Sequence, residues 1–246
     1  MINFLSKNLL KFFDFIYQKK IFKILKYYLK KKKITAIDSG AHFGETIFFL
    51  KKNFLIQKIY SFEPNKQDYV ALKNKLHNSK NVILFNFGLG SARQVKKLKV
   101  VIGDSAASTY NNLNFRSKYF KKKCLILNLD AANYYKEINT KIIPLEYIFK
   151  KFKINFVDYL KTDTEGYEFQ VLKGLKNSIK KVKLIHFEHH YNNMLNKEYT
   201  FSDINRYLIK NNFIQVFKTK MFFRKCFEYI YLNKMYQKNY LEKNLY

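Results

Sequence analysis

The sequence predicts an α/β protein in which helices cover both faces of a doubly wound, mostly parallel sheet. From Ile34 onward, short apolar runs alternate with longer amphipathic ones, as expected for a chain in which strands and helices alternate. The chain has 246 residues, 48% of them hydrophobic, with seven Gly and two Pro, so one compact domain without a flexible linker is expected. We divide it into a basic amphipathic extension (1–33), the domain (34–232) and a basic tail (233–246).

In the first half of the domain, the sequence predicts a repeated order of strand, turn and helix. Apolar runs of a few residues bounded by turn residues indicate buried strands, and the amphipathic runs between them indicate helices. Pro64 directs the chain away from the second strand so that a helix can start. The expected elements are strand 34–38, helix 44–52, strand 58–62, helix 66–78, strand 82–87 and a possible hairpin strand over 95–102.

The second half begins with an irregular segment, residues 103–140, which is rich in Ser, Asn and Tyr. Long segments of this kind are usually functional, so we expect a substrate loop or lid whose Ser105, Ser108 and Thr109 hydroxyls contact the acceptor. The elements expected after it are helix 145–151, strand 157–162, helix 167–177, strand 182–188, helix 201–211 and strands 213–218 and 226–232. The last two strands have no helix between them and should pair as an antiparallel hairpin.

The charge of the chain resembles that of a nucleic-acid-binding protein, but its composition argues against one. The formal net charge is +29, yet 43 of the 47 basic residues are Lys and four are Arg, the residue that phosphate and base recognition favour. We therefore attribute the charge to biased composition and expect no nucleic-acid partner. The two cysteines form neither a disulfide framework nor a zinc cluster, which indicates a reducing, cytoplasmic location.

The N-terminal extension, residues 1–33, carries apolar side chains at helical spacing among many lysines. Such a helix can lie on an anionic membrane, or it can pack its apolar stripe against the domain that follows, which we favour. No run reaches the roughly 18–20 apolar residues of a membrane-spanning helix, and no clean signal peptide is present. We expect a cytoplasmic protein with membrane-peripheral contact as the open alternative.

The turn after the first strand has the composition of a ligand site. Gly40 allows a tight turn, and Gly44 lets the next helix start close to the strand, but their spacing is not that of dinucleotide folds. Asp38 and Glu45 would repel a pyrophosphate and favour a cationic ligand. S-adenosylmethionine, with its amino group and sulfonium, therefore fits this turn better than NAD. An ordinary strand-to-helix turn is the alternative.

Two further strand ends add candidate cofactor contacts. Glu63 ends the second strand, one βαβ unit after Asp38, where a carboxylate can accept hydrogen bonds from both ribose hydroxyls. Asn86 and Gly88 follow the third strand and are placed to frame an adenine. We therefore expect the nucleoside part of the cofactor at these two strand ends.

The strand end around Asp163 carries the candidate catalytic residues. Asp163 and Glu165 crowd one turn, where two carboxylates can raise one another's pKa and one can act as general base. The alternative is that Glu165 only caps the helix that follows. His189 and His190 follow the next strand, and a histidine with an ordinary pKa near ~6.5 suits neutral-pH proton transfer, although either can be a plain loop residue. We assign the catalytic role to Asp163, Glu165 and His190, and no metal site, because the His and acidic residues lack the spacing of a known metal motif.

Four stretches of the chain resemble the FkbM family of methyltransferases over roughly residues 34–232. They are Asp-Ser-Gly-Ala-His-x-Gly at 38–44, Phe-Glu-Pro at 62–64, Asn-x-Gly-Leu-Gly at 86–90 and Leu-Lys-Thr-Asp-Thr-Glu-Gly-Tyr-Glu at 160–168, with Val-Leu-Lys-Gly at 171–174 after the last. The resemblance implies a class I, Rossmann-like methyltransferase fold with a seven-stranded sheet whose last strand is antiparallel. Glu146 departs from the pattern, since Asp is expected there.

The resemblance also implies a function and residue roles. It implies methyl transfer from S-adenosylmethionine, most often to a hydroxyl of a saccharide or secondary metabolite. Asp38, Gly40, His42 and Gly44 match the turn near the methionine part, Glu63 matches the ribose partner, and Asp163 and Glu165 match the acidic pair facing the methyl group. The cofactor set is thus Asp38, Gly40, His42, Gly44, Glu63, Asn86, Gly88 and Asp163.

Two other functions stay open on the same fold. Lys161, Asp163 and Glu188 faintly resemble the Lys/Asp/Glu constellation with which some RNA methyltransferases activate a hydroxyl. A membrane-peripheral binding protein that kept the fold and lost the chemistry is the other alternative.

Overall fold

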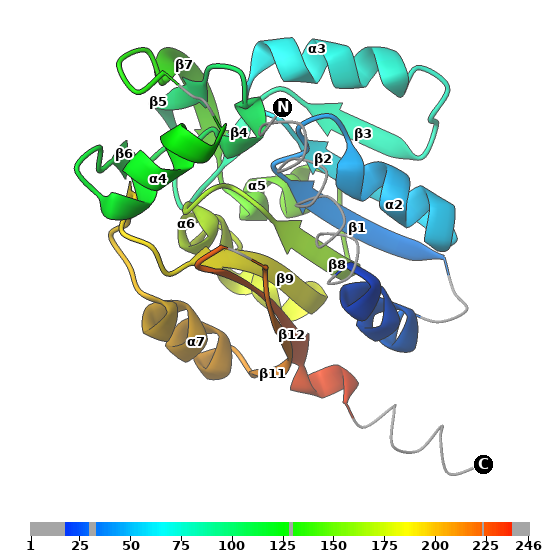
Figure 1. Cartoon of the computed structure of the whole chain (residues 1–246). Coiled ribbons are helices and arrows are strands. Elements are labelled where there is room, and N and C mark those ends of the chain that lie inside the picture. The colour runs from blue at the N-terminus through cyan, green and yellow to red at the C-terminus, as the bar shows by residue number, and fades with distance from the viewer. Residues whose placement is uncertain (1–17, 30–32, 128–129, 223, 238–246) are drawn as a thin grey trace.

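The computed structural model describes residues 18–29, 33–127, 130–222 and 224–237, and it confirms the α/β fold. Its centre is a seven-stranded sheet in the order β11-β12-β9-β8-β1-β2-β3 (Figure 1). The strands are β1 (Ile34–Ser39), β2 (Ile56–Phe62), β3 (Val82–Phe85), β8 (Val157–Thr162), β9 (Val182–His190), β11 (Phe213–Lys220) and β12 (Cys226–Asn233). The pairs from β3 to β9 are parallel, and β12 runs antiparallel to both of its neighbours. The C-terminal hairpin is therefore confirmed.

The strand order changes direction at β1, which lies between β2 and β8. The chain adds β2 and β3 on one side of β1 and later adds β8 and β9 on the other. In open α/β sheets, ligands bind in the crevice outside the carboxyl ends of the strands at such a switch point. The ends of β1 and β8 are therefore where the topology favours a site.

Helices cover both faces of the main sheet, each over its own apolar core. Residues 18–28 form a helix that shares one face with α2 (Glu45–Asn53) and α3 (Lys66–Lys75), while the opposite face carries α5 (Leu145–Lys151), α6 (Glu168–Lys173) and α7 (Phe201–Lys210). Leu25 and Leu50 lie in the first core, and Ile148 and Leu208 lie in the second. Successive strand residues point to opposite faces, so the alternating apolar side chains of the central strands supply both cores.

The described part of the N-terminal extension packs against the domain. Ile21, Leu25 and Leu29 are buried in the same core as α2, at the spacing expected for one helix face. The earlier apolar positions of the extension lie outside the described residues. None of the described helices combines the length and apolar character needed to span a membrane.

The expectation of an irregular segment over 103–140 is wrong. This segment contains α4 (Lys118–Leu127) and most of β7 (Tyr135–Ile143), besides the short elements η1 (Ser105–Ala107) and β6 (Asn112–Leu113). The apolar residues of this helix do not follow a clear helical period in the sequence. Phe120 and Cys124 are buried, but the apolar Leu125 and Ile126 are exposed, so the buried face is not evident from the sequence. The strand β7 is not evident from the sequence either, because much of it is exposed and carries charged side chains.

A second, three-stranded sheet forms beside the main one, in the order β4-β7-β5 (Figure 1). β5 (Gln94–Val101) pairs antiparallel with β7, a partner distant in sequence, and β4 (Gly88–Leu89) pairs parallel with β7. The short β10 (Leu195–Asn196) pairs with β6. The helix expected over 167–177 ends at Lys173 as α6, and the 3-10 helix η2 (Lys176–Lys181) follows it. Another 3-10 turn, η3 (Lys234–Tyr236), ends the described chain.

Candidate active site

A cavity of about 1110 Å³ opens at the carboxyl ends of β1, β8 and β9. Its walls come from the turn after β1, the helix over 18–28, the segment 104–107 with α4, and the tip of the β11–β12 hairpin. Five predicted site residues line it: Gly40, His42, Asp163, Glu165 and His190. The other predicted site residues, Asp38, Gly44, Glu63, Asn86 and Gly88, are not part of its lining.

The turn after β1 fits tightly against the end of β8. Gly40 has a φ of +89°, and a Cβ there would lie 1.9 Å from the carbonyl oxygen of Asp163. The amide of Asp163 in turn donates to the carbonyl oxygen of Ser39 at 3.0 Å. A residue with a side chain at position 40 would therefore push apart the two strand ends that carry the predicted cofactor and catalytic residues.

His42 links this turn to the segment over the cavity. Its Nδ1 lies 3.0 Å from Oε1 of Glu45, and its Nε2 lies 3.1 Å from the Ser105 hydroxyl, which also donates to Asp68. The hydroxyl of Ser105 is thus engaged inside the protein. This contact ties the segment 104–107 to the predicted cofactor turn.

Asp38 lies below the turn, inside the sheet. Its Oδ2 accepts a hydrogen bond of 2.9 Å from Ser61, while its Oδ1 has no hydrogen-bond partner among the described residues. Burial raises the pKa of Asp38 to about 6, although the nearby Lys161 ammonium and the Ser61 hydroxyl act in the opposite direction. Asp38 is therefore placed to hold the ends of β1 and β2 together.

Glu63 anchors a second network behind the turn. Its Oε2 accepts from the amide of His42 and its Oε1 from the amide of Asn65, both at 2.8 Å. Burial raises the pKa of Glu63 to about 7, against the effect of these two amides. Asn86 donates from its side chain to the carbonyl oxygens of Glu63 and Pro64. Both predicted residues thus brace the end of β2.

Gly88 lies in the same region, where Tyr110 packs against it. The hydroxyl of Tyr110 occupies the space that a Cβ at position 88 would take, and it hydrogen-bonds Thr140 at 2.8 Å. Gly88 also begins β4, whose backbone pairs with β7. The segment predicted to frame an adenine is thus part of the smaller sheet.

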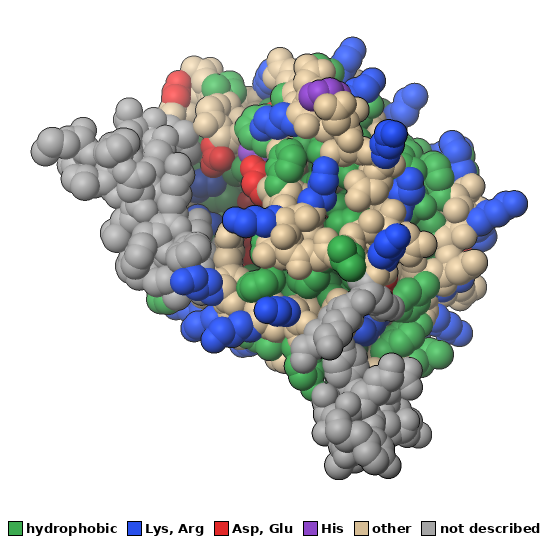
Figure 2. All heavy atoms as spheres, turned by 90° about the vertical axis from the view of Figure 1, so that its right-hand side faces the viewer, with side chains coloured by type: hydrophobic (Ala, Val, Ile, Leu, Met, Phe, Trp, Pro, Cys, Tyr) green, Lys and Arg blue, Asp and Glu red, His purple; other side chains and the backbone are tan. Residues whose placement is uncertain are grey.

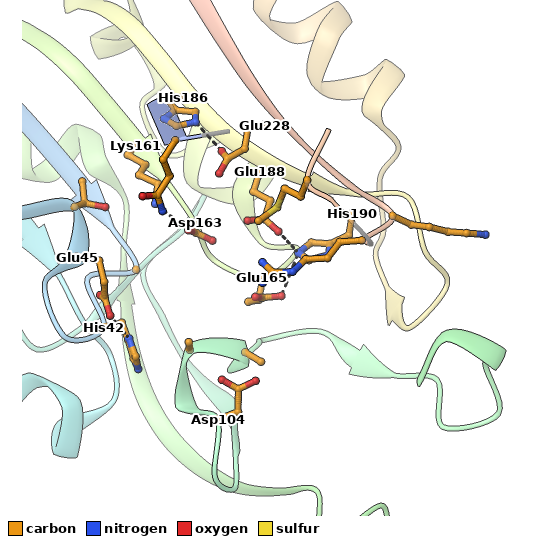
Figure 3. A pocket seen from close by; sticks show the side chains of 18 of the residues that line it. His42, Glu45, Asp104, Lys161, Asp163, Glu165, His186, Glu188, His190 and Glu228 are labelled. Carbon is orange, nitrogen blue, oxygen red and sulfur yellow. Dashed lines mark hydrogen bonds and ion pairs between the residues drawn. The ribbon is translucent and has the colours of Figure 1, made fainter. Parts of the chain in front are cut away.

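Asp163 is held ionised by the half-buried ammonium of Lys161. Nζ of Lys161 lies 2.9 Å from Oδ2 of Asp163, and both side chains line the cavity (Figure 3). Burial alone would raise the pKa of Asp163, but the Lys161 ammonium outweighs it and holds this pKa below its usual range. The expectation that neighbouring carboxylates raise the pKa of Asp163 is therefore wrong.

His190 lies between two carboxylates. Its Nε2 is 3.1 Å from Oε2 of Glu165 and 3.1 Å from Oε1 of Glu188, so three predicted or neighbouring site residues meet at one point. Burial disfavours the imidazolium, yet the two carboxylates outweigh it and raise the pKa of His190 well above its usual value. The expectation of an ordinary histidine pKa is wrong here. Burial lowers the pKa of His189 to about 3, and His189 does not line the cavity.

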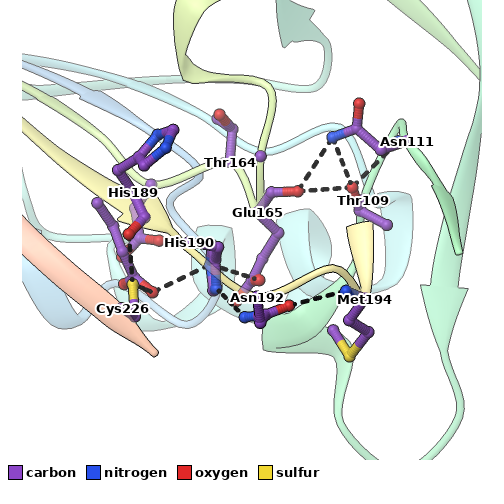
Figure 4. Close-up of polar contacts among 12 residues, drawn as sticks. Thr109, Asn111, Thr164, Glu165, His189, His190, Asn192, Met194 and Cys226 are labelled. Atoms are coloured by element: carbon purple, nitrogen blue, oxygen red, sulfur yellow. Dashed lines mark hydrogen bonds and ion pairs between the residues drawn. The ribbon is translucent and has the colours of Figure 1, made fainter. Parts of the chain in front are cut away.

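Glu165 is held in a special backbone conformation by the segment before β6. Its φ is +48°, a left-handed value that is uncommon for a residue with a side chain. The Thr109 hydroxyl donates to the carbonyl oxygen of Glu165 at 2.6 Å, and Asn111 donates to the same oxygen at 3.3 Å (Figure 4). Thr109 was expected to contact the acceptor, but its hydroxyl positions the turn that carries Glu165.

The sequence analysis missed three ionisable residues of the cavity region, namely His186, Cys226 and Glu228. Nε2 of His186 lies 2.6 Å from Oε2 of Glu228, and Nδ1 of His186 lies 2.6 Å from the Tyr159 hydroxyl. Cys226 donates to Oε1 of Glu188 at 2.7 Å. The alternation His-x-Glu-x-His over 186–190 puts His186 on the same face of β9 as Glu188 and His190, a signal that the sequence does contain. Cys226 and Glu228 lie on β12, and their approach depends on the pairing of β12 with β9.

The comparisons with known proteins agree with the sequence motifs. A model of the methyltransferase FkbM domain matches residues 38–214, and no match is found among curated proteins. A methyltransferase FkbM from Methylobacillus flagellatus KT aligns with a TM-score of 0.52 and 14% identity, over 80% of this chain and 43% of that one. Magnesium protoporphyrin IX methyltransferase from Synechocystis PCC 6803, solved with bound SAM, aligns with a TM-score of 0.53 and 8% identity, over 95% of this chain and 85% of that one.

These two structural likenesses show a shared fold, and this chain spans less than half the length of the Methylobacillus protein. The family match extends from the end of β1, through the cavity residues after β8 and β9, into β11. It therefore includes the Gly turn and all three predicted catalytic residues. The chain belongs to the FkbM methyltransferase family.

Proposed function

We propose that the protein transfers a methyl group from S-adenosylmethionine to a hydroxyl oxygen of a saccharide or a similar polyhydroxylated metabolite. One observation carries the proposal: the Gly turn after β1, the carboxylates after β8 and the carboxylate of Glu188 near the end of β9 line the same cavity of about 1110 Å³. Membership of the FkbM family supports methyl transfer. The choice of a hydroxyl acceptor rests on the carboxylates, which can take up its proton.

The cavity is lined by six acidic residues and by six Lys and Arg residues, and its acidic part beside the Gly turn suits a cationic group. S-adenosylmethionine, when bound, supplies an electrophilic methyl group on a sulfonium and carries an amino group, so it is attracted by Glu45, Asp163 and Glu165. Glu63, which lies behind the turn and outside the lining of this cavity, is our candidate for the ribose hydroxyls. Each of its carboxylate oxygens accepts one backbone amide, which leaves acceptor capacity on both oxygens.

The acceptor hydroxyl must lose its proton as its oxygen attacks the methyl carbon, so a base has to lie in the cavity. The carboxylates of Glu165 and Glu188 raise the pKa of His190 well above its usual value, which makes its imidazole a poor first acceptor of that proton. The base is therefore a carboxylate, with Glu165 as the acceptor of the proton. Asp163, ionised by Lys161, orients the hydroxyl, and His190 offsets the negative charge around Glu165.

A sugar ring has a stacking partner in the cavity wall. Tyr119 lines the cavity from α4, and aromatic side chains commonly pack against the apolar face of a ligand. Ser105 and Thr109 are engaged with His42 and Glu165, so they position the site. The acceptor contacts are therefore expected on the α4 side.

The test begins with calorimetric titration of S-adenosylmethionine, S-adenosylhomocysteine and NAD. We expect the first two to bind and NAD not to bind, and we expect Glu63→Ala to bind the first two more weakly. Methyl transfer from labelled S-adenosylmethionine to a panel of saccharides is then measured with Asp163→Asn. This variant should stay folded and lose transfer; wild-type turnover in it would remove Asp163 from the mechanism.

RNA methylation is the second candidate, because Lys161, Asp163 and Glu188 do line one cavity. Against it, the Lys161 ammonium is engaged by Asp163. Transfer to RNA that falls steeply with added salt would favour this candidate over a saccharide acceptor. Absence of binding of any methyl donor to the folded protein would instead favour a non-enzymatic binding protein.

A further inference from the structure

Three side chains with different metal-binding donor atoms meet in the wall of the cavity. Glu188 and His190 are two residues apart on one face of β9, and Cys226 is the register partner of His190 on β12. One donor atom from each of the three lies within 4.8 Å of the other two. They contribute a carboxylate oxygen, an imidazole nitrogen and a sulfur, and Figure 4 shows His190 and Cys226 facing the same point.

The distances are close to those of a metal site. Sγ of Cys226 lies 2.7 Å from Oε1 of Glu188, and Nε2 of His190 lies 3.1 Å from the same oxygen. Zinc bonds of about 2.0–2.3 Å in a tetrahedron put neighbouring ligand atoms about 3.3–3.7 Å apart. Small side-chain rotations that open the cluster by several tenths of an ångström would therefore suffice to admit an ion.

The cluster is buried. Cys226 is 0% exposed, and the side chains of Glu188 and His190 are each 10% exposed. Nε2 of His190 lies 3.1 Å from a carboxylate oxygen of Glu165 and 3.1 Å from one of Glu188, and the Cys226 thiol contacts the same Glu188 oxygen. Metal binding releases protons from its ligands, so a cation bound here would replace the protons that hold these groups together.

We infer that Glu188, His190 and Cys226 bind a zinc ion, with the fourth coordination position directed toward Glu165 and the cavity. Zinc readily binds thiolate, imidazole and carboxylate ligands together. Catalytic zinc sites typically have three protein ligands and one open coordination position. Oε2 of Glu165 lies 3.1 Å from Nε2 of His190, on the cavity side.

This inference goes beyond the proposed methyl transfer and does not depend on it. An ion held there would lie in the wall of the cavity that carries the predicted catalytic residues. It would bind the neutral imidazole of His190, and the ion would then offset the negative charge around Glu165 in place of the imidazolium. A metal ion in that place can polarise an acceptor hydroxyl. Binding of the ion is nevertheless measured without cofactor or acceptor. Absence of metal binding would therefore leave the methyltransferase proposal standing, and absence of methyl transfer would leave the metal site standing.

The experiment measures metal binding by the full chain after treatment with a chelator. Zinc stoichiometry is determined by equilibrium dialysis and elemental analysis, and cobalt(II) is added separately to reveal a thiolate-to-cobalt charge-transfer band. Cys226→Ser is compared with Cys124→Ser, which removes the other buried cysteine, located in α4. Thermal unfolding of each variant shows whether it is folded.

We expect one zinc per chain and a thiolate band in the wild type and in Cys124→Ser. Cys226→Ser should lose the band, and it should bind zinc more than about 10-fold more weakly, because loss of even an outer-shell partner of a ligand costs about that much. Glu188→Gln, which keeps the thiol, should keep the band and weaken binding. Absence of stoichiometric zinc in the wild type, or a band that persists in Cys226→Ser, would overturn the site and leave an ion-paired Glu–His–Glu cluster.

Discussion

The close approach of Gly40 to Asp163 explains at residue level why the turn after β1 needs glycine. The turn and the end of β8 are locked by a backbone hydrogen bond and by a contact that excludes any Cβ. The same contact places the predicted cofactor turn beside Asp163. Position 40 therefore combines a conformational and a steric requirement, and the two can be separated experimentally.

Gly40→Ala should destabilise the protein more than Gly103→Ala does. Both positions have a left-handed φ, +89° and +76°, so both variants carry the strain of about 1–2 kcal/mol that this conformation costs. Position 103 has no heavy atom within 4 Å of a built Cβ, whereas position 40 meets the Asp163 carbonyl oxygen. Urea unfolding should give a loss on the order of 4 kcal/mol or more for Gly40→Ala. Equal losses would show that the contact does not matter.

Glu63 predicts a pH dependence of cofactor binding. Because burial raises its pKa to about 7, the carboxyl is neutral below that pH and ionised above it. Two ribose hydroxyls are best bound by the ionised form, so affinity for S-adenosylhomocysteine should fall as the pH is lowered from 8 to 6. The fall approaches about 10-fold per pH unit below the pKa. Calorimetry on Glu63→Ala is the control: a slope that persists there belongs to another group, such as Asp38.

At the level of elements, the helix over 18–28 is part of the main core. Leu25 is 0% exposed and belongs to the apolar cluster shared with β1, α2 and α3. Gln18, Ile21 and Leu25 also line the candidate active-site cavity. The helix therefore contributes both to stability and to the wall of the site.

Leu25→Ala should cost about 2–5 kcal/mol of unfolding free energy, the range for removing a buried leucine side chain. Lys23→Ala, on the exposed side of the same helix, is the matched control and should change stability little. Urea denaturation followed by circular dichroism measures both. If Leu25→Ala proves as stable as Lys23→Ala, the helix does not contribute to the cooperative core.

The main-sheet strands were predictable because each combines a short apolar run with a clear turn signal, as β8 does before Asp163. The smaller sheet was not, since β7 is largely exposed and its partner β5 is distant in sequence. The residues of the candidate site also divide into a predictable and an unpredictable part. The Gly turn and the acidic stretch are local patterns, whereas the meeting of Cys226 with His190 depends on the register between β9 and β12.

For the whole molecule, the dominant feature is the net charge of +29. Lys and Arg side chains are scattered over the face shown in Figure 2, among apolar and neutral atoms. Many of the acidic groups that could balance them lie in the cavity, where they contact Lys161, His186 and His190. The compact chain therefore carries repulsion among surface lysines that moderate salt can screen.

The melting temperature should rise with NaCl, and most of the rise should occur below about 0.15 M, where the Debye length falls from about 30 Å at 0.01 M to about 8 Å. A variant that neutralises three exposed lysines, Lys73→Gln, Lys180→Gln and Lys210→Gln, provides the matched comparison. It should melt higher than the wild type at low salt and respond less to added NaCl, because less repulsion remains to be screened. Differential scanning calorimetry on both proteins over the same salt series measures this. A wild-type melting temperature that falls with salt would mean that attractive ion pairs, rather than lysine repulsion, govern the electrostatic part of its stability.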